Sequence, residues 1–350
     1  MKKIKINFLD FWSDFDKENN IFTNILKKHF DVEISNNPDF LFVTYMTFTE
    51  NPYAFTEYDC VRILVSWDTL YPDFNVFDYA ITNWQIECSD RHLWYPIAFV
   101  EIENMLQVQE KHKYVTENIL NTKTEFCDFI YSRGNEKGNW RDKAFEALSK
   151  YKPVISAGSY RNNDPEGNRV TINTKLPLQK KCKFSVSFEG IVEAGYISEK
   201  IFDSYRANSI PIYYGHNSTA EKVLNSASYI NIADYDYDFD RVIGKIKELD
   251  ENEELYLEML KQPVFISDTL VEDMYSSLEQ FLIHICSQNP EDAIRRIKEL
   301  RPYQQELLLN RFYKICTKYK LFYWIVVVLE KLNEKVKKII NCNKNNKYET

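Results

Sequence analysis

The sequence predicts two α/β domains that face each other across a central cleft, followed by a helical C-terminal extension. Stretches typical of strands alternate with stretches of helical spacing up to about residue 265, and only helical spacing follows Pro263. The length of 350 residues is sufficient for two hydrophobic cores. We place the domains at residues 1–120 and 121–265, and the extension at residues 266–350.

The first predicted domain contains several strand patterns and one clear helix pattern. Helical spacing covers residues 21–30, and the polar segment 101–121 is the predicted helical linker to the second domain. Asp68 directly follows one of the strands. The strands are expected at residues 3–9, 32–34, 40–43, 62–66 and 76–81.

The second predicted domain repeats this alternation. Its helices are expected near residues 140–148, 199–206 and 241–249, because apolar side chains recur there at helical spacing. Strands separated by helices usually pair in parallel, so we expect an open parallel sheet in this domain too. The strands are expected at residues 126–131, 151–155, 183–188, 210–214 and 229–232.

Residues 183–215 predict a strand, a helix and a second strand that form one βαβ unit. Ser198 is placed to cap the helix, and Glu199 falls in its first turn, where a negative charge suits the helix dipole. Such a unit directs a helix N-terminus to the carboxyl edge of a sheet, where α/β folds bind ligands. Free N–H groups there attract phosphate, and Lys200 adds a positive charge. These residues therefore predict an anion-binding site.

The same unit resembles a known family. Residues 188–189, 195–200 and 210–215 contain Phe-Glu, Gly-Tyr-Ile-Ser-Glu-Lys and Ile-Pro-Ile-Tyr-Tyr-Gly, and this set is similar to the signature of the α-1,3/4-fucosyltransferases of glycosyltransferase family 10. The resemblance extends over roughly residues 60–265. It implies the GT-B fold, GDP-β-L-fucose as donor substrate, and an inverting transfer of fucose that requires no metal and no other cofactor.

By this resemblance Asp68 stands in the place of the family's catalytic glutamate. Residues 67–80 are similar to the family's Gly-Glu-x-x-x-Pro-x-Phe-Asn…Phe-Asp-Tyr-Ala run, with Trp67 in place of the glycine. Inversion needs a carboxylate that deprotonates the acceptor hydroxyl opposite the departing diphosphate. Asp68 would be this base, although its reach is about 1.5 Å shorter than that of glutamate. A capping or strand-end acid is the alternative, and Asp73 and Asp78 are weaker candidates that we expect in turns.

The resemblance also implies which residues bind the donor. Arg161 and Lys200 would hold the diphosphate, Glu199 the ribose hydroxyls, and Tyr196 the diphosphate-sugar. The alternatives are a surface arginine for Arg161, a first-turn helix acid for Glu199 and a core tyrosine for Tyr196.

Three further positions complete the predicted donor site. Glu189 would contact the sugar or be structural, and Ser132 with Arg133 would contact the nucleotide. Gly190 replaces an asparagine of the family, so any contact of that amide is missing here. This replacement and the aspartate at position 68 leave open whether fucose is the only donor sugar.

Composition and spacing argue against several other classes of protein. A net charge of −8 argues against general nucleic-acid binding. The seven cysteines and five histidines lack metal-ligand spacing, and the Asp-x-Asp pattern in residues 234–240 is a weak metal signal in an acidic loop. Without a signal peptide or a span of sufficient length, a cytoplasmic protein with reduced thiols is expected.

The C-terminal end of the chain is basic and amphipathic. Residues 311–350 hold ten Lys and Arg against three acids, and apolar residues from 321 to 340 recur at helical spacing. This stripe suits peripheral contact with an anionic inner membrane, and packing on the protein with a solvated basic face is the alternative. We expect disorder in residues 341–350.

The sequence therefore predicts a fucosyltransferase. The expected acceptor is a glycan that contains β-galactoside and N-acetylglucosamine, as an oligosaccharide or glycolipid precursor of lipopolysaccharide or capsule. A transferase of the same fold with another nucleotide sugar or an atypical acceptor stays open. A non-catalytic protein that binds a glycan or a nucleotide is the alternative from a different class.

Overall fold

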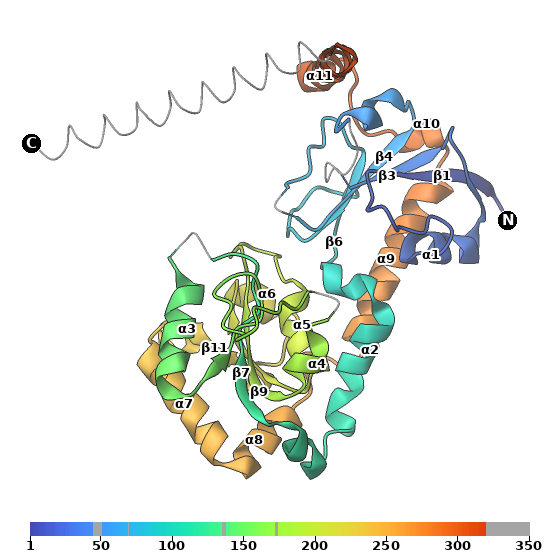
Figure 1. Ribbon diagram of the computed structural model, residues 1–350. Helices are drawn as coiled ribbons and strands as arrows, with labels where there is room; N and C mark the ends of the chain where they lie inside the picture. Colours follow the sequence, from blue (N-terminus) through green and yellow to red (C-terminus); the bar gives the residue numbers. More distant parts are fainter. Residues whose placement is uncertain (45–50, 69, 135–137, 172–173, 320–350) are drawn as a thin grey trace, which may run out of the picture. The chain divides into compact units, whose positions relative to one another are not determined.

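The computed structural model describes residues 1–44, 51–68, 70–134, 138–171 and 174–319 (Figure 1). The chain divides into two compact units, and each is described by itself. The first unit contains Met1–Ser66, Pro72–Ala80 and the segment from Ile285. The second unit contains Trp67–Tyr71 and Ile81–His284. The domain boundaries at residues 120 and 265 stay predictions.

A six-stranded sheet has the order β2-β1-β3-β4-β5-β6, and its β1–β2, β1–β3 and β3–β4 pairs are parallel. The apolar face of α1 (Ile21–His29) is buried, and the Asn20 side chain caps the helix by accepting a hydrogen bond from the Thr23 N–H. The strands are β1 (Lys3–Leu9), β2 (Asp31–Ile34), β3 (Phe40–Val43), β4 (Val61–Ser66), β5 (Tyr79–Thr82) and β6 (His92–Trp94).

Asp78 has a structural position within the first unit. Its side chain is fully buried, accepts a hydrogen bond from the Arg62 N–H at 2.8 Å and forms an ion pair with buried Arg296. Asp73 accepts a hydrogen bond from the Asn75 N–H at 2.9 Å, in the turn where the sequence placed it. That turn includes Val76, which explains why β5 begins three residues later than predicted.

The second unit contains a five-stranded sheet with the order β11-β10-β9-β7-β8, and all its neighbouring strands are parallel. Figure 1 shows α3 (Trp140–Tyr151) and α7 (Phe239–Glu251) on one face, and α4 (Leu176–Gln179) and α5 (Glu199–Arg206) on the other. The strands are β7 (Glu125–Asp128), β8 (Val154–Ile155), β9 (Cys182–Phe188), β10 (Ile210–Tyr214) and β11 (Ile230–Asn231).

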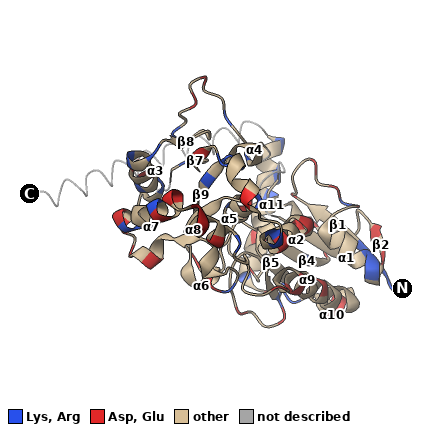
Figure 2. Cartoon of the chain, turned by 90° about the horizontal axis from the view of Figure 1, so that it is seen from below, with Lys and Arg blue, Asp and Glu red and all other residues tan. Residues whose placement is uncertain are grey.

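The helices of the second unit follow the predicted apolar spacing. In α7 the residues Val242, Ile246 and Leu249 are buried, and Figure 2 shows charges of both signs along the same helix. β8 is shorter than predicted because Tyr151 still belongs to α3, and extended Lys152 precedes a proline. The remaining helices here are α2 (Ile102–Glu110), α6 (Asn217–Ala220) and α8 (Glu253–Leu260).

In the described residues after α8 the regular elements are helices, as the sequence predicted. They are α9 (Leu270–Ser287), α10 (Pro290–Ala293) and α11 (Arg301–Lys318). Among the described residues, none of the helices combines the length and apolar character that crossing a bilayer requires. The amphipathic stripe at residues 321–340 and the tail after it lie outside the described residues.

Candidate active site

A pocket of about 820 Å³ lies in the second unit, beyond the carboxyl ends of its parallel strands. Its lining includes residues that follow β7, β8 and β9 and the last residue of β10, which is the edge where α/β folds bind ligands. Of the predicted site residues, this pocket brings together Asp68, Ser132, Gly190, Tyr196, Glu199 and Lys200.

The N-terminus of α5 is held by hydrogen bonds of Ser198 and Glu189. The Ser198 hydroxyl accepts a hydrogen bond from the Lys200 N–H at 3.4 Å, as expected of a capping residue. Glu189 is fully buried and accepts hydrogen bonds from the Ser198 N–H at 2.8 Å and from the Ser198 hydroxyl at 2.6 Å. Glu189 does not line the pocket, and its contacts fix the helix end that does.

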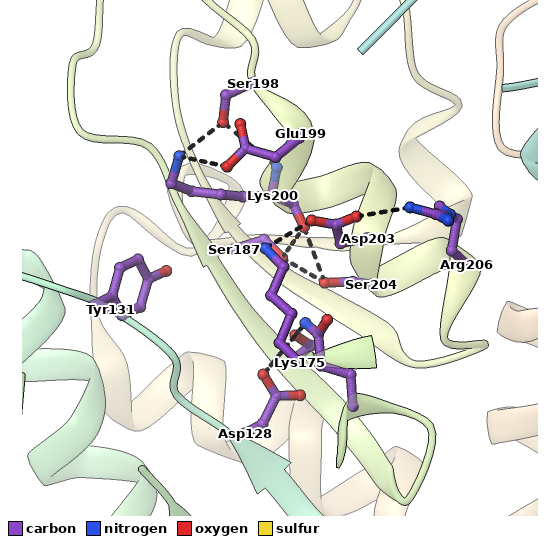
Figure 3. Close-up of polar contacts among 12 residues, drawn as sticks. Asp128, Tyr131, Lys175, Ser187, Ser198, Glu199, Lys200, Asp203, Ser204 and Arg206 are labelled. Carbon is purple, nitrogen blue, oxygen red and sulfur yellow. Dashed lines mark hydrogen bonds and ion pairs between the residues drawn. The ribbon is translucent and has the colours of Figure 1, made fainter. Parts of the chain in front are cut away.

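Lys200 has two acidic neighbours, Glu189 and Glu199. Its Nζ lies 3.3 Å from a Glu199 oxygen and 3.0 Å from the Ser198 hydroxyl (Figure 3). The same Nζ lies 3.8 Å from a Glu189 oxygen. Burial alone would lower the pKa of Lys200, but Glu189 and Glu199 outweigh it and raise this pKa above its usual value. Burial alone would raise the pKa of Glu199, but Lys200 and Lys175 outweigh it and lower this pKa. A lysinium and a carboxylate therefore lie side by side at the pocket wall.

The segment that carries Asp68 is fixed on both sides by buried residues of the same unit. The Asn83 side-chain amide donates to the Trp67 carbonyl at 2.6 Å, and the Trp84 indole N–H donates to the Leu70 carbonyl at 2.7 Å. Tyr71 stacks on Trp84 with ring centroids 4.3 Å apart. Asp68 itself is exposed and lines the pocket, so its carboxylate is accessible to a ligand.

The loop before Tyr196 approaches the backbone of residues 83–85 closely. Gly195 has φ +94°, and a Cβ atom there would lie 2.3 Å from the Asn83 carbonyl oxygen, so only glycine fits. The Trp94 indole N–H donates to the Gly195 carbonyl at 2.9 Å. The Tyr196 ring lies 6.1 Å from the Trp84 ring, and burial together with Glu189 raises the pKa of Tyr196 to about 12.

Among the predicted site residues, Arg161 differs most clearly in position from the prediction. It does not line the pocket, and its guanidinium forms ion pairs with Asp142 at 2.5 Å and with Glu146 at 2.9 Å. Its backbone is left-handed, with φ +51°. Acids of α3 therefore hold Arg161 outside the pocket lining, and its contact with a diphosphate stays a prediction.

Two family profiles match this chain over most of its length. The profile described as the α-(1,3)-fucosyltransferase FucT N-terminal domain matches residues 6–100. The profile described as glycosyltransferase family 10 (fucosyltransferase) C-term matches residues 104–296. The chain belongs to glycosyltransferase family 10.

Relatives of this family 10 chain include an α-(1,3)-fucosyltransferase FucT of Helicobacter pylori, which is 27% identical over 293 residues. That match covers 73% of this chain and 59% of the relative. A 4-galactosyl-N-acetylglucosaminide 3-α-L-fucosyltransferase 9 of Bos taurus is 33% identical over 125 residues, which are 34% of this chain and 33% of the relative. The chain thus spans less than two thirds of the length of either protein.

A solved structure described as α1,3-fucosyltransferase with GDP-fucose has a similar fold. Its TM-score with this chain is 0.61 at 23% identity, and the likeness covers 80% of this chain and 90% of that one. This confirms the fold class that the sequence predicted, α/β of the GT-B type, with helices added at the C-terminal end.

Two aspartates of the Asp-x-Asp segment at residues 234–240 have partners within the same segment or helix. Within the described ranges, no group of three or more His, Cys, Asp or Glu could hold a metal ion. In the Asp-x-Asp segment, Asp238 caps α7 and Asp236 forms an ion pair with Arg241. Asp236 and Asp238 thus have local structural contacts in this segment.

Two basic residues of the pocket were not predicted from the sequence. Lys175 precedes α4 and forms an ion pair with Asp203 at 2.7 Å, and Arg141 lies in the first turn of α3 (Figure 3 labels Lys175 and Asp203). Neither lies in a motif, and the residue pattern predicted only the apolar face of α3. A basic residue at the start of a helix that follows a parallel strand was the available signal for Arg141.

Proposed function

We propose that this chain transfers L-fucose from GDP-β-L-fucose to a glycan hydroxyl with inversion, forming an α-linkage. The observation that carries the proposal is that one pocket is lined both by Asp68 and by the α5 N-terminus with Glu199 and Lys200. Membership of family 10 supports the sugar transfer. The solved structure with GDP-fucose and the names of the relatives support the donor.

In the proposed mechanism the base, Asp68, and the leaving diphosphate lie on opposite sides of the fucose that is transferred. Asp68 accepts the proton of the acceptor hydroxyl as that oxygen attacks the anomeric carbon, while the bond to the diphosphate breaks. Lys200 stabilises the charge that develops on the diphosphate, and its acidic neighbours keep it protonated. Glu199 binds the ribose hydroxyls, and Tyr196 and Ser132 contact the donor. A cationic diphosphate site of this kind makes a metal ion unnecessary.

The proposed acceptor contains galactose linked to N-acetylglucosamine. The name of the bovine relative supports this choice, since it names a 4-galactosyl-N-acetylglucosaminide as the molecule that the relative fucosylates. We also propose that the basic residues after 311 allow peripheral contact with an anionic membrane that carries the acceptor, on the strength of their excess positive charge.

The proposal is tested first by ligand binding and product formation. Thermal shift with GDP-, UDP- and CMP-sugars should show a response selective for guanine, and mass spectrometry should detect fucosylated N-acetyllactosamine. A thermal shift selective for uracil or cytosine nucleotides would support a transferase of the same fold with a different donor. Donor binding without transfer to any acceptor would support a non-catalytic binding protein.

A pair of acid variants tests the base. Asp68→Asn should abolish transfer while GDP affinity stays within about twofold, because the carboxylate acts only on the acceptor. Asp73→Asn is the matched control, since Asp73 does not line the pocket and asparagine retains its turn contact. Transfer by Asp68→Asn at the original rate would refute Asp68 as base.

A further inference from the structure

Tyr71 is an exposed aromatic residue in the segment that carries Asp68. It follows Asp68 by three positions, so the two Cα atoms lie at most about 11 Å apart. Both residues belong to the stretch Trp67–Tyr71 of the second unit. Tyr71 is 56% exposed, whereas Trp84, on which it stacks, is 2% exposed. A large exposed side chain therefore lies within reach of a ligand that contacts Asp68.

The Tyr71 ring is held in one orientation by Trp84. The two ring centroids are 4.3 Å apart, and the ring planes meet at 15°. The Trp84 indole N–H donates to the Leu70 carbonyl at 2.7 Å, so the same tryptophan also fixes the backbone beside Tyr71. Trp84 covers one face of the Tyr71 ring, and the exposure of Tyr71 leaves the opposite face open. This open face is flat, apolar and oriented before any ligand binds, which lowers the entropic cost of binding.

A row of aromatic rings connects Tyr71 with the pocket. Trp84 contacts Tyr71 on one side, and its ring centroid lies 6.1 Å from that of Tyr196, which lines the pocket. Tyr71 itself does not line the pocket. A ligand group on the Tyr71 ring would therefore lie beside the reacting group and not in the pocket with it. In an oligosaccharide, this is the place of the sugar ring next to the one that reacts.

The open face of Tyr71 suits the apolar side of a galactose ring. The π-electrons make the face of an aromatic ring partly negative, so it attracts the weakly positive hydrogens of C–H groups. Galactose presents several C–H groups on one side of its ring, because its axial hydroxyl points to the other side. The proposed acceptor contains galactose linked to N-acetylglucosamine, so it offers this side to a neighbouring aromatic ring.

We propose that Tyr71 stacks on the galactose ring of the acceptor while Asp68 contacts the hydroxyl of the adjoining N-acetylglucosamine. The proposal rests on the proposed function, because it assigns a residue to the acceptor of that reaction. Tyr71 then determines specificity: it favours acceptors that carry the galactose and takes no part in the proton transfer. The phenol hydroxyl is not needed for this contact, because the ring face alone makes it.

Kinetics of the full-length chain with two acceptors test the contact. Tyr71→Leu still covers Trp84 but has no aromatic face, so its KM for N-acetyllactosamine should rise about three- to tenfold while kcat and GDP affinity stay within about twofold. Its KM for the methyl β-glycoside of N-acetylglucosamine, which lacks the galactose, should not change. Tyr71→Phe should keep the original KM for both acceptors, because it keeps the ring.

Tyr114→Leu is the matched control for these measurements. Tyr114 is a tyrosine of the same unit that is 77% exposed and does not line the pocket, so its KM values should stay those of the original protein. An unchanged KM for N-acetyllactosamine in Tyr71→Leu would overturn the proposal. Equal rises in KM for both acceptors, or a loss of kcat and GDP affinity, would overturn it in favour of a tyrosine that only supports the fold around Trp84.

Fluorine NMR tests the same contact without transfer and without the leucine variant. The protein is labelled with fluorotyrosine, and the Tyr71 resonance is the one that is absent from Tyr71→Phe. With GDP present, this resonance should shift when N-acetyllactosamine is added and stay in place with the N-acetylglucosamine glycoside. A shift without any product from GDP-fucose would uphold this inference and refute the proposed reaction. Product without a shift would refute the role of Tyr71 alone.

Discussion

Replacing Asp128 with asparagine should change how stability depends on pH. Asp128 ends β7 directly before the pocket, is fully buried and accepts a hydrogen bond from the Ser185 hydroxyl at 3.0 Å. Its other oxygen has no hydrogen-bond partner among the described residues. Burial raises the pKa of Asp128 from 3.8 to about 7. Asparagine has the same shape, keeps the acceptor and cannot ionise.

The direction and the size of this change in stability follow from the number of protons that the folded and unfolded chains bind. Between about pH 4 and pH 7 the unfolded chain loses the Asp128 proton while the folded protein keeps it, so stability falls as pH rises. The slope is about 1.4 kcal/mol per pH unit, and the pKa difference of about three units makes the total loss about 4 kcal/mol above pH 7. Asp128→Asn removes this loss, so its gain over the original protein should grow with pH.

Urea unfolding at intervals from about pH 5 to about pH 8 measures this difference. The difference between the two proteins is needed because burial lowers the pKa of Lys123 to about 7, and its titration changes stability in the opposite direction. Asp14→Asn, at an exposed aspartate, is the control and should show no growing difference. If the free energy of unfolding changed with pH equally for the original protein and for Asp128→Asn, the argument would be refuted.

Four other predictions concern the pocket. Asn83→Ala should reduce the rate of transfer at least about tenfold, because the Asp68 segment loses the hydrogen bond that holds it, while GDP affinity stays within about twofold. Enzyme kinetics measure the rate and calorimetry measures the affinity. Equal losses of rate and of GDP affinity would contradict this prediction. Gly195→Ala should lower the free energy of unfolding by about 2 kcal/mol or more, because the added Cβ atom clashes with the Asn83 carbonyl. Urea unfolding measures this change, and an unchanged free energy of unfolding would contradict the close approach. Lys200→Met should weaken GDP binding about 10- to 100-fold with guanosine unaffected, and a loss for both ligands would indicate a damaged fold instead. Transfer in EDTA should stay within about twofold of transfer with Mg²⁺, and loss of activity that Mg²⁺ restores would refute a metal-free mechanism.

The βαβ unit that shapes the pocket was predictable because its signals are local. The sequence placed the second strand at residues 210–214, which is where β10 lies, and the Ser198 cap and the start of α5 at Glu199 were also correct. Capping and apolar spacing depend on neighbours a few residues away. The prediction that Asp68 and Lys200 belong to one site also agrees with their common place in the pocket lining.

The remaining parts of the site depend on contacts between distant residues. The sequence does not reveal that Asn83 donates to the Trp67 carbonyl, because a single asparagine in the sequence does not show whether its side chain is buried or at the surface. Arg141 owes its position to carbonyls at residues 133 and 188. Arg161 was placed by a motif, but the acids of α3 determine the direction of its side chain. Backbone motifs therefore predicted the loops better than they predicted the orientation of the side chains.

The short stretch Trp67–Tyr71 belongs to the compact unit that otherwise begins at Ile81. A chimera that exchanges residues 1–66 with those of a relative would thus leave Asp68 and the Asn83 amide that holds its segment native to the recipient. An exchange at residue 120 would instead import both together and separate them from the native Gly195 loop, which lies close to the backbone of residues 83–85. Crossover points should accordingly be set before residue 67, with residues 72–80 exchanged as a separate insert.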